Sequence, residues 1–465
     1  MSSFYIENFG CRAARADGEA VAASLCADGL EQRKLAVAEV VVVNTCSVTA
    51  EADRDARAFV RRAHRLNPKA RIVVTGCYAQ RAPEQLAALD GVCAVVGNSH
   101  KALVPEIVKR LDPGDQQAGP DRKDPHKEPS ASSTLIPTVQ LIYSSQTTSV
   151  WVDDSFAHSA IESAQVAPGE QTRPNLKIQE GCANRCTFCI IPTTRGASRS
   201  LSEERVLDQV NGFVDAGGNE LVLSGINLGR WGRDLEHATT LARLVERIVS
   251  ETRLARLRLS SIEPMDWTEE LIARMGKFGG SRLARHAHLP LQSGSDSVLR
   301  RMHRRYRPWH YAEKVAALAS AVGDELAVGA DVMVGFPGES DAEFTETYAL
   351  IASLPFTYLH LFPFSPRPGT RGWQMHREQP VATEVVRERM HALRQLAEEK
   401  SAAFRARMRG RTLPAITLHT PALVAAQGRT LSLTDNFLEV ELAGAWSANH
   451  LISACVEEGK LARKA

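Results

Sequence analysis

Short apolar runs alternate with amphipathic helical patterns through residues 1–110, and this alternation restricts the fold more than any other feature of the sequence. Strands are expected at residues 4–8, 39–43, 71–75 and 92–96, and helices at 17–29, 51–66 and 83–89. Such an order predicts a parallel sheet, because each helix carries the chain back to the same edge of the sheet. Residues 1–111 are therefore expected to form a Rossmann-like α/β domain.

The alternation resumes beyond residue 173, where helical patterns separate most of the apolar runs. Strands are expected at residues 176–178, 220–223, 256–260, 286–289, 326–334 and 358–362. This pattern fits a (β/α) partial barrel, whose functional groups gather at the carboxyl ends of its strands. We assign this domain to residues 173–400.

Two further segments have different compositions. Residues 112–172 are rich in Pro, Ser, Gln, Thr and charge, and we expect a poorly structured linker with at most one strand. After a long charged helix at 381–408, short β-type runs occur at 411–418, 422–424, 430–433 and 437–442. They predict a small C-terminal β-barrel domain, assigned to residues 401–465.

Composition limits the class of protein. A chain of 465 residues with 24% charged residues reads as a globular protein of several domains. Its apolar runs fall far short of the roughly 20 residues of a membrane helix, and no secretory signal pattern opens the sequence. A cytoplasmic monomer that does not bind membranes is expected. The net charge of +2 neither requires nor excludes a nucleic-acid partner.

Three cysteines lie close together directly after the first expected barrel strand: Cys182, Cys186 and Cys189. Thiolates are the usual ligands of iron–sulfur clusters, and three of them leave one iron of a cubane open. Zinc is the alternative, but a structural zinc site usually has four protein ligands, and only His158 is near enough in sequence to supply the fourth. The pattern favours a [4Fe–4S] cluster.

A second set of cysteines is distributed over the first domain. Cys11, Cys46 and Cys77 each follow an expected strand, and the carboxyl ends of parallel strands meet at one edge of a sheet. This shared position favours a second cluster over three separate buried thiols. The remaining cysteines, Cys26, Cys93 and Cys455, lie in helical or apolar patterns and suit that simpler interpretation.

The Cys-x3-Cys-x2-Cys spacing, with Phe188 before the last cysteine, resembles the signature of the radical S-adenosylmethionine superfamily. The resemblance implies that the open iron chelates S-adenosylmethionine and that reduction cleaves it to methionine and a 5′-deoxyadenosyl radical. It also implies cofactor contacts at the ends of barrel strands. The residues assigned to these contacts are Gly217, Gly218, Glu220, Ser260, Glu263, Gln292, Gly335, Phe336 and Gly338.

Over almost its whole length the chain resembles the methylthiotransferases. The matching motifs are residues 9–12, 44–49, 75–80, 177–182, 189–192, 195–196 and 289–295. The resemblance implies an auxiliary [4Fe–4S] cluster on Cys11, Cys46 and Cys77 that carries the inserted sulfur. It also implies a second S-adenosylmethionine as methyl donor. The contexts of Cys46 and Cys77 look most like the branch that modifies carbon 2 of threonylcarbamoyladenosine beside the tRNA anticodon.

The expected partners follow from this resemblance. The tail resembles a TRAM domain, a β-barrel that binds RNA, and two basic groups could contact the tRNA anticodon loop. These groups are Arg300, Arg304 and Arg305, and Arg405, Arg407, Arg409 and Arg411. A cellular electron donor such as flavodoxin or ferredoxin is implied. The alternatives are a methylthiotransferase for isopentenyladenosine or for a ribosomal protein aspartate, and a non-catalytic RNA-binding zinc protein.

Overall fold

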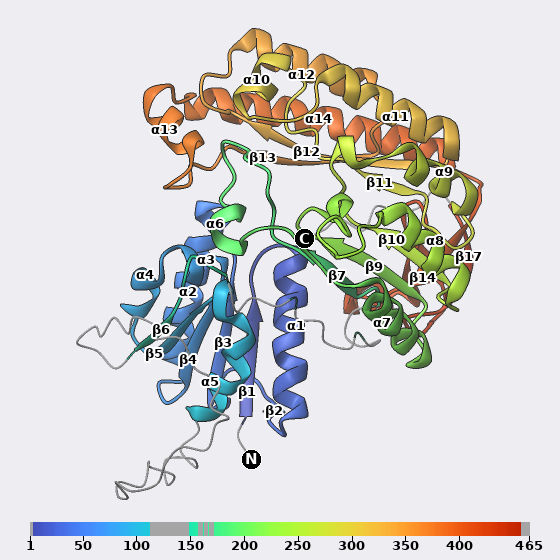
Figure 1. Cartoon of the computed structure of the whole chain (residues 1–465). Coiled ribbons are helices and arrows are strands. Elements are labelled where there is room, and N and C mark those ends of the chain that lie inside the picture. The colour runs from blue at the N-terminus through green and yellow to red at the C-terminus, as the bar shows by residue number, and fades with distance from the viewer. Residues whose placement is uncertain (1–2, 112–147, 157–160, 162–165, 167–171, 457–465) are drawn as a thin grey trace, which may run out of the picture. The chain divides into compact units, whose positions relative to one another are not determined.

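The computed structural model of the chain describes residues 3–111, 148–156, 161, 166 and 172–456 (Figure 1). The contacts divide the chain into two compact units. The first contains residues 1–164 together with 193–196, and the second contains 165–192 and 197–465. Most of the expected linker, residues 112–147, lies outside the described residues.

The first unit is a parallel sheet of six strands in the order β2-β1-β3-β4-β5-β6, as the alternation predicts. Its strands are β1 (Ser3–Asn8), β2 (Glu31–Gln32), β3 (Val40–Thr45), β4 (Arg71–Gly76), β5 (Val92–Gly97) and β6 (Ser149–Trp151). Its helices are α1 (Arg12–Ala27), α2 (Ala50–Leu66), α3 (Cys77–Arg81), α4 (Pro83–Ala87) and α5 (Val104–Arg110), with the 3-10 helix η1 (Asn98–Leu103).

Local sequence explains why α2 begins and packs where it does. The Thr49 side chain accepts a hydrogen bond from the backbone N–H of Ala52 at 3.2 Å, which caps the first turn. Glu51 in that turn complements the positive end of the helix dipole. Phe59 and Val60 lie on the buried face and pack against the sheet, with residues such as Val41 and Val74 in the same core.

Strand β6 lies within the segment that we assigned to a linker. It pairs in parallel with β5 through Ala94, Val95 and Val96, and thereby forms one edge of the sheet. The first unit therefore extends beyond residue 111, where the expected domain ended.

The second unit contains the six barrel strands at the positions that the sequence predicts. They are β7 (Asn175–Glu180), β9 (Glu220–Gly225), β10 (Arg256–Leu259), β11 (His286–His288), β12 (Ala327–Val334) and β13 (Tyr358–Pro363). They pair in parallel as β7-β9-β10 and as β11-β12-β13. A parallel bridge between Ser261 and His288 joins the two groups, which makes a partial barrel. The short strand β8 (Arg199–Ser200) runs antiparallel beside β7.

Helices connect the barrel strands, and two further helices follow the last barrel strand, β13. They are α6 (Ile191–Arg195), α7 (Glu203–Asp215), α8 (Leu241–Glu251), α9 (Glu269–Phe278), α10 (Asp296–Arg301), α11 (Pro308–Val322), α12 (Asp341–Ser353), α13 (Arg371–Glu378) and α14 (Thr383–Met408), with η3 (Leu228–Arg230) and η4 (Pro264–Asp266). In Figure 1 the long helix α14 runs alongside α11 and α12 above β12 and β13.

The C-terminal part of the second unit is an antiparallel sheet in the order β16-β15-β14-β17. Its strands are β14 (Thr412–Thr417), β15 (Arg429–Thr434), β16 (Glu439–Ala443) and β17 (Leu451–Cys455). The strand expected at residues 422–424 is wrong, because Ala422–Ala425 forms the helical turn α15 after Pro421. The fourth strand of the sheet is instead β17, which pairs with β14 and contains Cys455.

Within the described residues, none of the helices combines the length and the apolar character that crossing a membrane requires.

Candidate active site

Three cysteines gather at the carboxyl edge of the sheet in the first unit. Cys11 precedes α1, Cys46 follows β3, and Cys77 begins α3 directly after β4. Burial, and then the neighbouring thiols of Cys77 and Cys11, raise the pKa of the Cys46 thiol to about 12. The chain approaches closely here, because a Cβ placed on Gly10 would lie 2.6 Å from the Cys46 sulfur. The three thiols are therefore neighbours at the carboxyl edge of the sheet, as their positions after expected strands predict.

The sulfur of Cys77 accepts hydrogen bonds from two buried side chains. The Arg195 guanidinium donates through Nε at 3.2 Å, and the Asn98 amide donates at 3.4 Å. Arg195 also bonds to the Asp17 carboxylate at 3.0 Å, and Lys101 shares that carboxylate at 2.7 Å. A guanidinium directed at a sulfur atom fits a thiolate or a cluster ligand better than a neutral thiol.

Arg195 reaches this position because residues 193–196 group with the first unit, although the chain on both sides belongs to the second. The Asn98 amide donates to the backbone carbonyl of Thr194 at 2.7 Å and so holds this short segment. Arg195 was not among the predicted site residues, and its place in the matched motif at residues 195–196 is the one sequence signal that points to it.

The second trio of thiols follows β7 in the barrel. Burial, and then Cys186 and Cys182, raise the pKa of the Cys189 thiol to about 12, and Arg304 opposes the shift. Backbone and side-chain amides donate to the Cys182 sulfur, from Asn184 N at 3.4 Å and from Asn227 Nδ2 at 3.6 Å. The three sulfurs therefore lie in one neighbourhood surrounded by hydrogen-bond donors.

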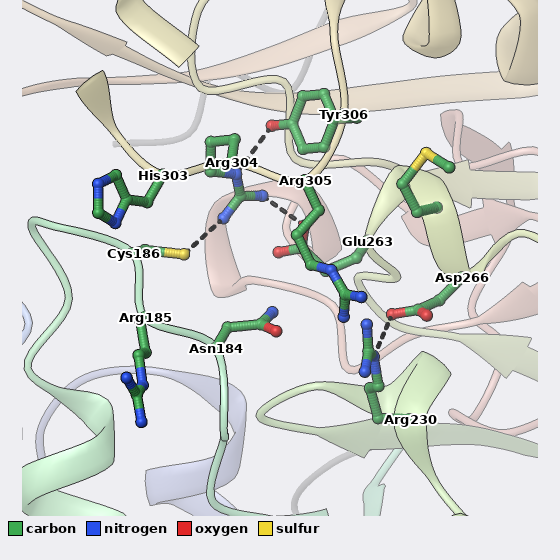
Figure 2. A pocket seen from close by; sticks show the side chains of 11 residues that line it. Asn184, Arg185, Cys186, Arg230, Glu263, Asp266, His303, Arg304, Arg305 and Tyr306 are labelled. Carbon is green, nitrogen blue, oxygen red and sulfur yellow. Dashed lines mark hydrogen bonds and ion pairs between the residues drawn. The ribbon is translucent and has the colours of Figure 1, made fainter. Parts of the chain in front are cut away.

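Arg304 is the counterpart of Arg195 in the barrel. Its Nη1 donates to the Cys186 sulfur at 3.3 Å, its Nη2 pairs with the Glu263 carboxylate, and its Nε contacts the Tyr306 hydroxyl at 3.2 Å (Figure 2). Arg304 is only 7% exposed. We predicted that this side chain contacts RNA, but it is buried and bonded to the Cys186 sulfur and the Glu263 carboxylate, so that prediction is corrected.

Three buried polar atoms near the strand ends have no hydrogen-bond partner among the described residues. They are Asn227 Oδ1 after β9, Ser260 Oγ after β10 and Gln292 Oε1 after β11. Buried polar groups are normally satisfied, so an unpaired group in a native structure often marks a missing ligand or water. The carboxyl ends of three successive strands therefore present polar atoms that a cofactor could satisfy. Ser260 and Gln292 belong to the predicted contacts, whereas Asn227 was not among them.

The predicted cofactor contacts at Gly217, Gly218 and Glu220 are wrong. Glu220 begins β9, so it lies at the amino end of the barrel, whereas Cys182 follows the carboxyl end of the parallel strand β7. A six-residue strand separates the two ends by about 20 Å. Glu220 is fully buried and pairs with Arg258 at 2.8 Å and Arg256 at 3.1 Å, which is a structural role. The segment that contains Asn227 follows the carboxyl end of β9, which is where a cofactor contact from this strand is expected.

The turn after β12 has the close packing expected of a glycine-rich turn. Gly335 and Gly338 have φ values of +76° and +71°, and a Cβ on Gly335 would lie 2.5 Å from Val386 of α14. The Gly335 N–H donates to the Glu339 carboxylate at 2.8 Å. The side chain of Phe336 is fully buried, so only the backbone of this turn is available to a cofactor. The predicted contacts of Gly335, Phe336 and Gly338 with adenine remain predictions.

A cationic pocket lies beside Cys186 in the second unit (Figure 2). Arg185 and Arg305 are exposed, and Arg230 pairs with Asp266 at 3.2 Å. The lining residues are Asn184, Arg185, Cys186, Arg230, Glu263, Met265, Asp266, His303, Arg304, Arg305 and Tyr306. Of the other predicted RNA contacts, Arg300 is exposed and pairs with Asp296.

Of the four predicted RNA-binding arginines that precede the C-terminal sheet, two are exposed and two bond to other residues. Arg407 and Arg409 are exposed. Arg405 donates to the Glu439 carbonyl at 2.8 Å, and Arg411 pairs with Glu325 at 3.1 Å. Arg407 and Arg409 therefore remain the more accessible candidates for RNA contact.

The chain matches two family models. Residues 3–97 match a family described as Uncharacterized protein family UPF0004, and residues 176–351 match the Radical SAM superfamily. Threonylcarbamoyladenosine tRNA methylthiotransferase MtaB of Bacillus subtilis is 34% identical over 96% of this chain and 91% of its own length. The MtaB protein of Aquifex aeolicus is 31% identical over 97% and 99%. This chain belongs to the radical S-adenosylmethionine methylthiotransferase family.

Other relatives define how wide that family is. A tRNA-2-methylthio-N(6)-dimethylallyladenosine synthase of Geobacter metallireducens is 32% identical over 79% of this chain and 76% of its own length. Among solved structures, the radical S-adenosylmethionine methyltransferase TsrM of Kitasatospora setae matches with a TM-score of 0.51 and 15% identity, over 78% of this chain and 75% of that one. That likeness concerns the fold alone, and it agrees with the barrel of the second unit.

Proposed function

We propose that this methylthiotransferase adds a methylthio group to carbon 2 of N6-threonylcarbamoyladenosine in tRNA and that it uses two [4Fe–4S] clusters. One observation carries the proposal. Two separate trios of thiols occur in one chain, the first after three parallel strands and the second after the carboxyl end of β7. Each trio has a buried arginine directed at one of its sulfurs. A single-cluster enzyme would not require the first trio.

The residues present fit the two groups. Cys182, Cys186 and Cys189 would hold the cluster that binds S-adenosylmethionine through its open iron. Cys11, Cys46 and Cys77 would hold the auxiliary cluster. When bound, the clusters and S-adenosylmethionine supply the one-electron chemistry and the methyl group. The chain itself aligns the thiolates, surrounds them with N–H donors, and offers Ser260, Gln292 and Asn227 to the cofactor's polar groups.

The basic surfaces support a nucleic-acid substrate. Arg185 and Arg305 are exposed in the pocket beside Cys186, where an anionic strand would be attracted close to the reacting atoms. Arg407 and Arg409 give the C-terminal sheet a second basic approach. The bases of an anticodon loop are unpaired and can turn outward into such a pocket. A tRNA substrate would be met in the cytoplasm, where we expect the enzyme to take electrons from a flavodoxin or ferredoxin.

The choice of threonylcarbamoyladenosine rests on the MtaB relatives of Bacillus subtilis and Aquifex aeolicus, which match over 96% and 97% of this chain, whereas the two dimethylallyladenosine synthases match over 79% and 82%. Dimethylallyladenosine is the second candidate substrate, because two tRNA-2-methylthio-N(6)-dimethylallyladenosine synthases are each 32% identical to this chain.

Nucleoside mass spectrometry of tRNA from a strain that lacks this gene tests the proposal. The methylthio form of threonylcarbamoyladenosine should disappear while the unmethylthiolated nucleoside persists, and the wild-type gene should restore it. A C182A variant should not restore it. Loss of the methylthio form of dimethylallyladenosine alone would transfer the activity to the second candidate.

A further inference from the structure

Three potential metal ligands converge on one face of the barrel sheet. None of them is near the six predicted cluster cysteines in the sequence. His288 lies on β11, Asp331 on β12 and His360 on β13. The imidazole Nε2 of His288 lies 3.2 Å from one carboxylate oxygen of Asp331, and Nδ1 of His360 lies 3.2 Å from the other. The three ligand atoms lie within 4.8 Å of one another.

The register of the strands explains this convergence. Asp331 pairs directly with His360, and His288 pairs with Gly329, which precedes Asp331 by two residues. Side chains two residues apart along a strand lie on the same face. The three side chains therefore share one face as a consequence of the parallel pairing.

A second layer of contacts orients His288. The Tyr358 hydroxyl lies 2.9 Å from Nδ1 of His288 and 2.7 Å from Nε2 of His286. Gly329 makes room for this tyrosine, because a Cβ on Gly329 would lie 2.0 Å from the Tyr358 ring. Phe437 of the C-terminal sheet stacks on His286 with ring centroids 4.6 Å apart. Metal-binding histidines are commonly fixed in this way through their second ring nitrogen.

We propose that His288, Asp331 and His360 bind a divalent transition-metal ion of the zinc class, with Tyr358 as the hydrogen-bond partner that orients His288. Zinc bonds of about 2.0–2.1 Å place tetrahedral ligands about 3.3 Å apart, close to the separations found here. Two imidazoles and one carboxylate leave at least one coordination position for water or for an oxygen of a bound molecule. The His360 side chain is 60% exposed, so an ion can reach the site from solvent.

Zinc binding by the full-length protein, with its clusters reconstituted anaerobically, tests this proposal. Zinc is titrated at low stoichiometry, and bound zinc and iron are counted separately by mass spectrometry after dialysis. The wild-type protein should retain about one zinc per chain. D331N keeps the shape of the side chain, H360Q changes an exposed position, and both should lose most of the zinc while their iron content stays unchanged.

Two further variants sharpen the result. Y358F should weaken zinc binding about 10–100-fold, the usual effect of removing a partner of a ligating histidine. His391 is exposed on α14, and H391A should bind zinc like the wild-type protein. X-ray absorption at the zinc edge should show nitrogen and oxygen ligands.

Either of two outcomes would overturn the proposal. Zinc that is absent from the wild-type protein, or equally retained by D331N and H360Q, would leave the cluster as a hydrogen-bonded group without an ion. Sulfur ligands at the zinc edge would place the metal on cysteines instead. Neither outcome affects the proposed methylthiotransferase activity, which is measured on tRNA.

Discussion

The Nε atom of Arg195 lies 3.2 Å from the Cys77 sulfur, and the same guanidinium bonds to the buried Asp17 carboxylate. The pair Arg304 and Cys186 repeats this arrangement in the barrel, with Glu263 as the carboxylate. In each trio of thiols, a cation that the chain itself holds in place is directed at one sulfur. This relationship would give the protein a way to adjust the charge around each of the two proposed clusters.

Replacing Arg195 should lower the reduction potential of the auxiliary cluster. A cation and an N–H donor at a ligand sulfur stabilise the more negative, reduced state, so their removal disfavours reduction. R195Q should shift the potential downward by tens of millivolts, and R195K should shift it less because it keeps the charge. Redox titration followed by electron paramagnetic resonance measures the shift. R15Q, at an exposed position of α1, should leave the potential unchanged, and an unchanged potential in R195Q would contradict the assignment.

Replacing Arg304 should affect both the stability and the chemistry of the barrel. The buried Arg304 side chain pairs with the partly exposed Glu263 carboxylate, and replacing Arg304 leaves that carboxylate and the Cys186 sulfur without their cationic partner. R304Q should lose about 2–4 kcal/mol of unfolding free energy. It should also form 5′-deoxyadenosine more slowly. Denaturant unfolding and chromatographic assay of that product measure the two effects. An R304Q protein with wild-type stability and product formation would show that this contact has no role.

A glycine-to-alanine pair tests how tightly the chain packs at the auxiliary site. Gly10 has φ +103°, and an added Cβ would lie 2.3 Å from the Cβ of Cys46. Displacement of Cys46 should reduce the iron content of G10A from about eight to about four per chain. Gly29 has a similar φ of +87° but nothing within 4 Å, so G29A carries the backbone strain without the clash. Iron loss in G10A but not in G29A is expected, and equal iron in both would refute the packing argument.

The carboxylate of Glu220 should make stability depend on pH. Burial alone would raise its pKa, but Arg258, Arg173 and Arg256 lower it below its ordinary value of 4.5. A lowered folded-state pKa contributes stability above the unfolded value, and that stability is lost as the pH falls through the folded value. E220Q should therefore lower the free energy of unfolding by about 3–5 kcal/mol near pH 7.

The difference between E220Q and the wild-type protein should shrink below pH 4.5, where protonation of Glu220 begins to remove the same interaction. Denaturant unfolding across this pH range measures it. E236Q, at an exposed position, should match the wild-type protein throughout. A difference between E220Q and the wild-type protein that stays constant with pH would contradict the lowered pKa.

Strand positions and cysteine positions could be predicted because both depend on local pattern. The run Val40–Val43 reads as a buried strand, and Cys46 must then lie at the carboxyl edge. Glu220 was misassigned because the Gly217-Gly218 pair before it resembles a cofactor motif, although the strand predicted at residues 220–223 already placed Glu220 at the amino end of that strand. Arg304 was misassigned too, because its basic neighbours suggested an exposed patch although its own side chain is buried.

The contact of Arg195 with Cys77 could not have been predicted from the sequence, although the motif at residues 195–196 points to the residue. Its role depends on residues 193–196 packing in the first unit, far in sequence from Asp17 and Cys77. No periodicity in the sequence encodes a contact between such distant segments. Likewise, the pairing of His288, Asp331 and His360 follows from strand register, which the sequence pattern does not fix to one residue.

We propose that each trio of thiols holds its own cluster. Iron and sulfide counts on anaerobically reconstituted protein test it most directly, with the wild-type chain compared with the triple alanine variants at residues 11, 46 and 77 and at residues 182, 186 and 189. If each trio holds one [4Fe–4S] cluster, the wild-type chain should contain about eight irons and each triple variant about four. A wild-type chain with about four irons, unchanged by the first triple substitution, would contradict it.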